Sequence, residues 1–152
     1  MKLNKWFLMA AGVFFLTSCE KDDPDNVNKV DISGKNNKEV FMIQPWGLYS
    51  YSQTMNNQTV DAMDECLKDE VFVFKANDVC DVLTKGVKCY DGEPDSYESS
   101  WSMPSATGDI VNFLSFDFTI KSKTNSSIVL EREWENRTGE WVIEKLELRA
   151  TK

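Results

Sequence analysis

The side chains best suited to covalent chemistry in this chain are its four cysteines, at positions 19, 66, 80 and 89. A thiol can be alkylated, can pair in a disulfide or can bind a metal. The chain has no histidine. This removes the usual general base, the Ser-His and Cys-His nucleophile pairs and the commonest neutral metal ligand. We therefore expect the cysteines to anchor and cross-link the protein rather than to catalyse a reaction.

Carboxylates are the other candidates, in the pairs Asp22-Asp23, Asp69-Glu70 and Glu93 with Asp95. Paired carboxylates perform acid–base chemistry only when their surroundings separate their pKa values. These pairs lie in segments predicted as linker, strand start and loop, where water surrounds them. A calcium loop containing Asp91, Glu93 and Asp95 would lack the required glycine and the distal bidentate glutamate. We predict that the protein is not an enzyme and holds neither a cofactor nor a metal.

The first residues have the features of an export signal. Lys2 and Lys5 precede residues 6–16, which are all apolar or glycine. This run is shorter than the roughly 20 residues of a membrane-spanning helix. A basic start and a short apolar core are typical of a secretory signal peptide that is removed from the mature protein.

The end of this segment, Leu16-Thr17-Ser18-Cys19, resembles the lipobox of bacterial lipoproteins. In that family diacylglycerol is attached to the cysteine, and cleavage makes this cysteine the new N-terminus. The resemblance implies a signal peptide at 1–18, lipidation of Cys19 with fatty acids such as palmitate, and a place in the outer membrane. Each buried CH2 of an acyl chain contributes about 0.8 kcal/mol, so more than one chain gives stable anchoring. The alternative is a plain signal peptide whose Cys19 forms a disulfide.

Acidic residues follow the anchor directly. Residues 20–23 resemble the short signal of one lysine and several acids found in surface-displayed lipoproteins of some Gram-negative gut anaerobes. They also suit a solvated linker, so surface exposure stays open. Removal of 1–18 takes away Lys2 and Lys5 but no acid, which changes the net charge from −8 to −10. Since binding to nucleic acids relies on Lys and Arg at the phosphates, we expect no nucleic-acid partner.

The elements that must carry these residues are predicted to be strands. Residues 19–40 are polar and form a predicted tether, which leaves 41–152 as one small domain. Short alternating or β-branched runs separated by turn residues predict eight strands. They cover 46–52, 70–76, 79–85, 97–103, 110–115, 116–121, 127–135 and 141–149. Only 60–67 favours a helical turn. We therefore predict an all-β domain, a small antiparallel eight-stranded barrel.

The best-defined pair of strands surrounds Asn77-Asp78, two residues that tolerate a tight hairpin turn. A two-residue turn there sets Phe72 opposite Leu83 and Cys66 opposite Cys89. Opposed strand residues lie within reach of disulfide geometry, and an exported domain meets an oxidising compartment. We predict a Cys66–Cys89 disulfide, with two reduced thiols as the alternative. Cys80 is then left as a small buried apolar residue.

The C-terminal residues predict a second hairpin, with its turn at 136–139. The register sets Trp134 opposite Val142, and on the same face Arg132 meets Glu144. One apolar and one charged face suit a half-buried antiparallel ladder. In 110–120 the apolar residues Ile110, Leu114, Phe116, Phe118 and Ile120 share one parity, which predicts that they share one face.

Together these residues resemble the lipocalin-like domains of bacterial lipoproteins. The resemblance rests on Trp46, the run CLKDEVFVFKAN at 66–77, Cys89 at the end of the hairpin and Trp101, and it spans about 46–148. Where the family's turn commonly has Asp-Gly or Asn-Gly, this chain has Asn77-Asp78. The resemblance implies a barrel with a cup at one end that binds a small apolar or amphipathic ligand.

The candidate ligand-binding residues are aromatic: Phe72, Phe74, Phe116, Phe118, Tyr90, Tyr97 and Trp101. A small eight-stranded barrel can also be filled by its own side chains, and Trp46 and Trp101 are expected to pack in the core. The second hypothesis is a non-enzymatic interaction or inhibitor protein. Its loops 54–69 and 90–101 would then meet a protein or glycan partner at the cell envelope.

Overall fold

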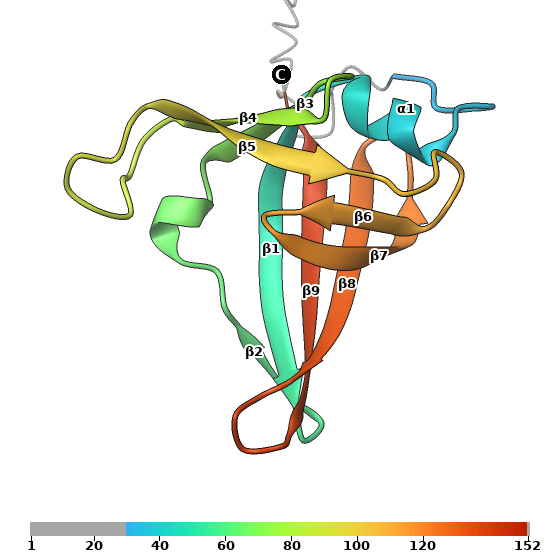
Figure 1. Cartoon of the computed structure of the whole chain (residues 1–152). Helices are drawn as coiled ribbons and strands as arrows, with labels where there is room; N and C mark the ends of the chain where they lie inside the picture. Colours follow the sequence, from blue (N-terminus) through green and yellow to red (C-terminus); the bar gives the residue numbers. More distant parts are fainter. Residues whose placement is uncertain (1–29, 152) are drawn as a thin grey trace, which may run out of the picture.

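The computed structural model describes residues 30–151. The predicted signal peptide, Cys19 and residues 20–29 of the predicted tether lie outside these residues. Within them the chain forms one α-helix, one 3-10 helix and nine strands (Figure 1). Their bounds are α1 Asn37–Met42, β1 Trp46–Met55, β2 Gln58–Asp61, η1 Glu65–Leu67, β3 Glu70–Phe74, β4 Val79–Thr84, β5 Ser96–Ser102, β6 Ile110–Phe113, β7 Phe116–Lys123, β8 Ser127–Glu135 and β9 Trp141–Ala150.

Eight of these strands close into an antiparallel barrel, as predicted. Strands β3 to β9 pair in sequence order, and β1 pairs with both β3 and β9 to complete the circle. The additional strand β2 pairs with Ser52–Met55 of β1, below the short contact between β1 and β3. All eight predicted strands are present. The predicted helical turn at 60–67 is partly wrong, because Val60 belongs to β2 and only Glu65–Leu67 is helical.

The strands differ in length, and this shapes the barrel. Strands β1, β8 and β9 have nine or ten residues each, whereas β3, β4 and β6 have four to six. The long strands therefore run on past the others and form a projection below the barrel (Figure 1). None of the helices within residues 30–151 has the length and apolarity that crossing a bilayer requires.

Aromatic side chains fill the upper part of the barrel. Trp46 and Trp101 are fully buried, as predicted, and each indole N–H donates to a backbone carbonyl, of Phe41 and Lys75 respectively. Tryptophan is stable in a core when its N–H is satisfied in this way. Phe74 lies 5.0 Å from Trp101, measured between ring centroids.

Helix α1 closes this end. Asn36 caps its first turn by accepting from the backbone N–H of Glu39, whose carboxylate accepts from the N–H of Asn36. The helix buries Val40 and Phe41, and the Phe41 ring stacks on Trp101. The folded part thus includes residues 37–40, which the sequence analysis assigned to the tether.

The β3–β4 hairpin has a different register from the predicted one. Phe72 lies opposite Val82 rather than Leu83, and Cys80 lies opposite Phe74. The cause is a three-residue loop in place of a two-residue turn: Lys75 N–H donates to Val79 O at 2.8 Å, and Asp78 adopts a left-handed conformation with φ 62°. Such a loop adds one residue to the hairpin and moves the register by one.

The disulfide is nevertheless correctly predicted. Cys66 and Cys89 lie at disulfide distance, with their Cα atoms 5.0 Å apart. Cys66 belongs to η1, and Cys89 lies in the loop after β4, so the pair joins two connecting segments rather than two opposed strands. Cys80 is buried and unpaired, and burial raises the pKa of its thiol to about 12.

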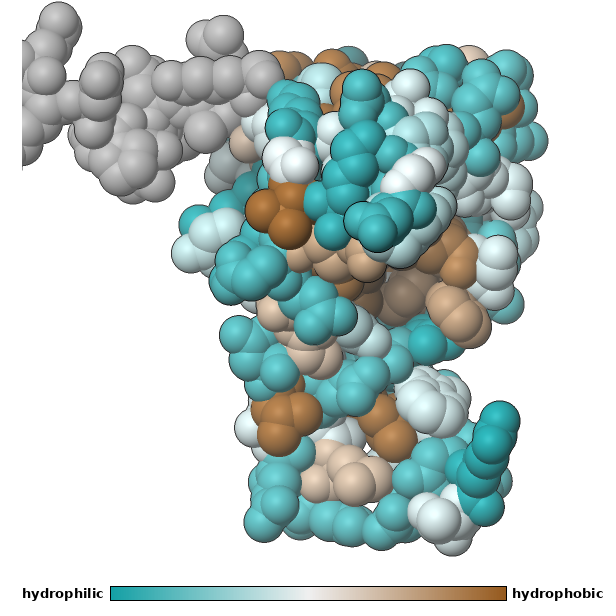
Figure 2. Space-filling view, turned by 90° about the vertical axis from the view of Figure 1, so that its left-hand side faces the viewer, coloured by the Kyte–Doolittle hydropathy of each residue, from teal (hydrophilic) through white to brown (hydrophobic). Residues whose placement is uncertain are grey.

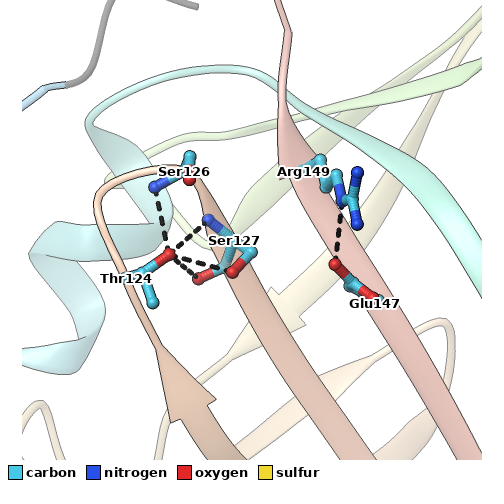
Figure 3. A network of polar contacts seen from close by, with 5 residues as sticks. All are labelled: Thr124, Ser126, Ser127, Glu147 and Arg149. Carbon is cyan, nitrogen blue, oxygen red and sulfur yellow. Dashed lines mark hydrogen bonds and ion pairs between the residues drawn. The ribbon is translucent and has the colours of Figure 1, made fainter. Parts of the chain in front are cut away.

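The C-terminal hairpin has the predicted register along its whole length. Trp134 pairs with Val142 and Arg132 with Glu144. At its upper end, Thr124 Oγ1 accepts from the backbone N–H groups of Ser126 and Ser127, which closes the turn between β7 and β8 (Figure 3). On β9 nearby, Arg149 donates to Glu147 at 2.8 Å.

The prediction for 110–120 is wrong for β6. Its buried residues are Val111 and Phe113, while Ile110 is exposed and Leu114 lies in the turn. Leu114 and Ser115 both have positive φ, 52° and 67°, and form a tight two-residue turn between β6 and β7. This turn breaks the alternation that the sequence pattern assumes.

Candidate functional site

An apolar hollow of about 140 Å³ lies at the open, lower end of the barrel. Its apolar lining comes from β1, η1, β3, the β6–β7 turn, β7 and β9: Leu48, Leu67, Phe72, Leu114, Phe118 and Leu146. Figure 2 shows this side of the molecule hollowed between the upper part and the lower projection, with apolar side chains in the recess. The hollow exists because the aromatic core fills only the upper part of the barrel.

Arg132, on β8, extends into this hollow. Its Nε donates to a carboxylate oxygen of Glu144, directly opposite on β9. The guanidinium carbon lies 3.6 Å from the ring centroid of Phe116, and the rings of Phe118 and Trp134 are within 6 Å. A guanidinium over aromatic faces is stabilised by their negative potential. The ion pair and the stacking together hold Arg132 at the rim of the hollow.

Several hydrogen-bond donors compensate the negative charge of Glu144. Besides Arg132, the phenol of Tyr51 and the amide of Gln53 each donate to it at 3.0 Å. The side chain of Glu144 is 4% exposed and that of Arg132 is 16% exposed. A charge so far buried is stable only with such partners. Burial also raises the pKa of Tyr51, so its phenol remains a donor at neutral pH.

Glu70 is the third ionisable group of the hollow, and its surroundings are different. It is 6% exposed and lines the hollow together with Phe72 of the same strand. Within residues 30–151 no group donates a hydrogen bond or forms an ion pair to its side chain. Burial raises its pKa first, and the negative charges of Glu93 and Asp69 raise it further. The hollow therefore combines apolar walls, an ion pair and a carboxyl group that has no hydrogen-bond donor or ion-pair partner among residues 30–151.

Of the seven aromatic residues predicted to bind a ligand, the hollow gathers three. Phe72 and Phe118 line it, and Phe116 lies at its rim, 47% exposed. Phe74 and Trp101 instead pack in the aromatic core.

The two tyrosines do not line the hollow. Tyr90 is 61% exposed in the loop before β5. Tyr97 lies opposite the buried Val82, and burial and then the negative charge of Glu70 raise its pKa, so it lies near that carboxyl group.

The polar side of the hollow was not predicted, although the sequence contains a signal for it. Glu70 shares the parity of Phe72 and Phe74, which are buried, so it is a charge at an inward position. Arg132 and Glu144 were predicted to face each other on the apolar face, and this indicates an internal ion pair. Among the polar residues that line the hollow, only Tyr51 has no such signal in the sequence.

Two of the three acids of the possible calcium loop, Glu93 and Asp95, have internal partners. Glu93 is buried and accepts from the Cys89 N–H at 2.6 Å, and Asp95 pairs with Lys88 at 2.5 Å. Hydrogen bonding and the charge of Lys88 lower the pKa of Asp95. No cluster of three or more metal-ligating side chains occurs in residues 30–151.

Comparisons with protein families, with curated proteins and with solved structures found no match to this chain.

Proposed function

We propose that this protein is a lipid-anchored lipoprotein of the outer membrane whose barrel binds a small amphipathic ligand at its open end. The observation that carries the proposal is the hollow itself. Concave, mostly apolar sites with a few convergent polar groups are the usual form of small-molecule sites in proteins. A closed eight-stranded barrel with an open end also agrees with the resemblance to lipocalin-like domains, whose ligands lie in such a cup.

The size of the hollow limits the ligand. Trp46, Phe72 and Phe113 are fully buried above it, so a long acyl chain has no room inside the barrel. The hollow has a volume of about 140 Å³. An apolar cavity of about 150 Å³ can hold benzene. The expected ligand thus places a phenyl-sized apolar body in the hollow and its polar part near the rim.

A titration with a neutral phenyl compound tests this proposal. A chain that begins at residue 20 keeps every residue that the structure describes. We expect 2-phenylethanol to bind saturably and to shift the NMR signals of residues around the hollow. Leu67→Trp should fill the hollow and weaken binding at least tenfold, whereas Val87→Trp, at an exposed position in a loop, should not. Absence of saturable binding to the unmodified barrel would reject the ligand site.

The anchor is tested separately. In the mature protein isolated from membranes, mass spectrometry should find an acylated cysteine from position 19 at the N-terminus. Cys19→Ala should leave the protein unlipidated and release it from the outer membrane, because the acyl chains that anchor it are then missing. Protease treatment of intact cells distinguishes surface display from a periplasmic position. An unmodified thiol at position 19 would contradict the anchor.

A second candidate function is binding to a protein or glycan partner. The loop between β4 and β5 favours it, since Tyr90 and Val87 are exposed there although the neighbouring Cys89 ties the loop to η1. Exposed aromatic groups on a restrained loop are typical of binding surfaces. If this function is correct, Tyr90→Ala should reduce reproducible capture of a partner from envelope extract, with Tyr49→Ala on β1 as the control. No specific capture by the native protein would reject it.

A further inference from the structure

Glu70 lacks the compensation that the other two ionisable groups of the hollow have. Arg132 and Glu144 neutralise each other, and Glu144 has two further donors. The three groups together therefore carry one net negative charge, which belongs to Glu70. A buried carboxylate without a partner is costly, and such a group is stabilised by a cation that arrives close to it.

The charges around Glu70 increase the stabilisation that a bound cation would give its carboxylate. Glu93 and Asp69 act on it with the same sign. Lys88, in the same loop as Glu93, is already bound to Asp95 and to the backbone carbonyl of Glu93. No cation from residues 30–151 pairs with Glu70. The potential near its carboxyl group thus favours positive charge in the hollow.

The rest of the lining suits an organic cation better than a metal ion. Phe72 and Phe118 present aromatic surface, and four leucines add aliphatic surface. Aromatic faces attract cations, and the apolar walls favour a ligand with an apolar body. A metal ion would need several oxygen ligands, whereas Glu70 is the only uncompensated carboxyl among the groups that line the hollow.

We propose that Glu70 binds the ammonium group of a small organic amine whose phenyl-sized apolar body occupies the hollow. This inference rests on the proposed ligand-binding function and names the class of ligand. Glu70 supplies a charge-assisted hydrogen bond to the ammonium group. The aromatic and aliphatic walls enclose the body of the ligand, and the Arg132–Glu144 pair holds β8 and β9 together beside it.

Three probes of matched shape test the inference: 2-phenylethylamine, 2-phenylethanol and 3-phenylpropanoate, which differ in charge. We expect calorimetry on the chain from residue 20 to show at least tenfold tighter binding of the amine than of the alcohol. Glu70→Gln should abolish this preference and leave the affinity for the alcohol within about twofold. Glu98→Gln removes an exposed acid outside the hollow and should preserve the preference. Glu70→Leu is a second variant that should also abolish the preference for the amine.

The outcomes separate the two proposals. If none of the probes binds, the proposed ligand site itself is wrong. If the alcohol binds as tightly as the amine, the ligand site stands and the role of Glu70 is overturned. Tightest binding of 3-phenylpropanoate, lost in Arg132→Met, would also overturn it, because Arg132 would then be the recognition residue.

The pH dependence gives an independent readout. Binding of the amine should weaken as the pH falls through the raised pKa of Glu70, since a protonated carboxyl cannot pair with ammonium. The ionisable groups around it are Glu93, Asp69 and Tyr97, with Arg132, Glu144 and Tyr51 also lining the hollow. Glu70→Gln should bind the amine equally over this range, and a profile unchanged by the substitution would contradict the assignment.

Discussion

At the scale of single residues, Glu70 differs from Arg132 and Glu144 because it has no partner of opposite charge among residues 30–151. All three line the same hollow, and burial together with the neighbouring acids Glu93 and Asp69 raises the pKa of Glu70. The folded protein therefore binds the Glu70 proton more tightly than the unfolded chain does. This difference links the candidate site to the stability of the whole domain.

Glu70→Gln should make the protein more stable at neutral pH. Since the pKa is raised above its ordinary 4.5 on folding, stability from this group is complete below about pH 4.5 and decreases as the pH rises through the folded value. Each unit of the difference corresponds to about 1.4 kcal/mol. In thermal unfolding, the variant should exceed the wild type at about pH 8, and the gain should vanish near pH 4. A gain of equal size at both pH values would exclude titration as its cause.

The Arg132–Glu144 pair should show strong coupling. Glu144→Leu alone leaves Arg132 largely buried without a partner, and we expect a loss of about 3 kcal/mol in the free energy of unfolding. The double variant Arg132→Met with Glu144→Leu should recover most of this loss, because the remaining side chains are apolar. Urea unfolding measures both.

The Lys121–Glu131 pair on the more exposed face is the control for this cycle. Removal of Lys121 there should change stability by less than about 1 kcal/mol. A double variant in the hollow that is less stable than Glu144→Leu alone would contradict the interpretation.

At the scale of elements, turns decide where side chains point. The C-terminal hairpin contains Gly139, with φ 82°, at a position that favours glycine, and its register is the predicted one. In the β3–β4 hairpin, Asp78 adopts the left-handed conformation and lengthens the loop. In the β6–β7 turn, Leu114 and Ser115 do so without any glycine. The register was therefore predicted correctly in the hairpin whose left-handed turn position is occupied by glycine, and not in the hairpins where other residues occupy it.

Helix α1 is predicted to stabilise the barrel through Phe41. Its ring is buried and contacts Phe74 and Trp101, with ring centroids 5.0 and 5.9 Å away. Phe41→Ala should lower the free energy of unfolding by about 3–5 kcal/mol in urea, as for other large-to-small changes in cores. Met42→Ala, at a partly buried position of the same helix, should cost clearly less. Equal losses would indicate that the helix, rather than the ring, is the stabilising unit.

At the scale of the whole molecule, the disulfide restricts the unfolded chain. Cys66 and Cys89 are 23 residues apart, and closing a loop of this size contributes about 3 kcal/mol in the chain-entropy description. Cys66→Ser with Cys89→Ser should lower the midpoint of thermal unfolding while the hollow keeps its affinity for a neutral ligand. Cys80→Ser, at a buried position outside the disulfide, controls for the loss of a thiol. An unchanged midpoint in the double variant would contradict a stabilising role.

The sequence by itself determined eight of the nine strands, the all-β class and the register of β8 with β9. These features depend on local alternation and on turn residues, which a single segment contains. The sequence did not determine the β3–β4 register or the inward face of β6, because both depend on left-handed residues other than glycine.

Only the tertiary structure decided the hollow and its charges. The hollow depends on which strands end early and on how far aromatic side chains from distant segments, such as Phe41 and Phe113, fill the interior. The raised pKa of Glu70 depends on its burial and on the nearby acids Glu93 and Asp69. Its lack of a cationic partner depends on the hydrogen bond that Arg132 donates to Glu144 instead. Compensation of a charge is a property of distances through space, and these distances exist only once the barrel has closed.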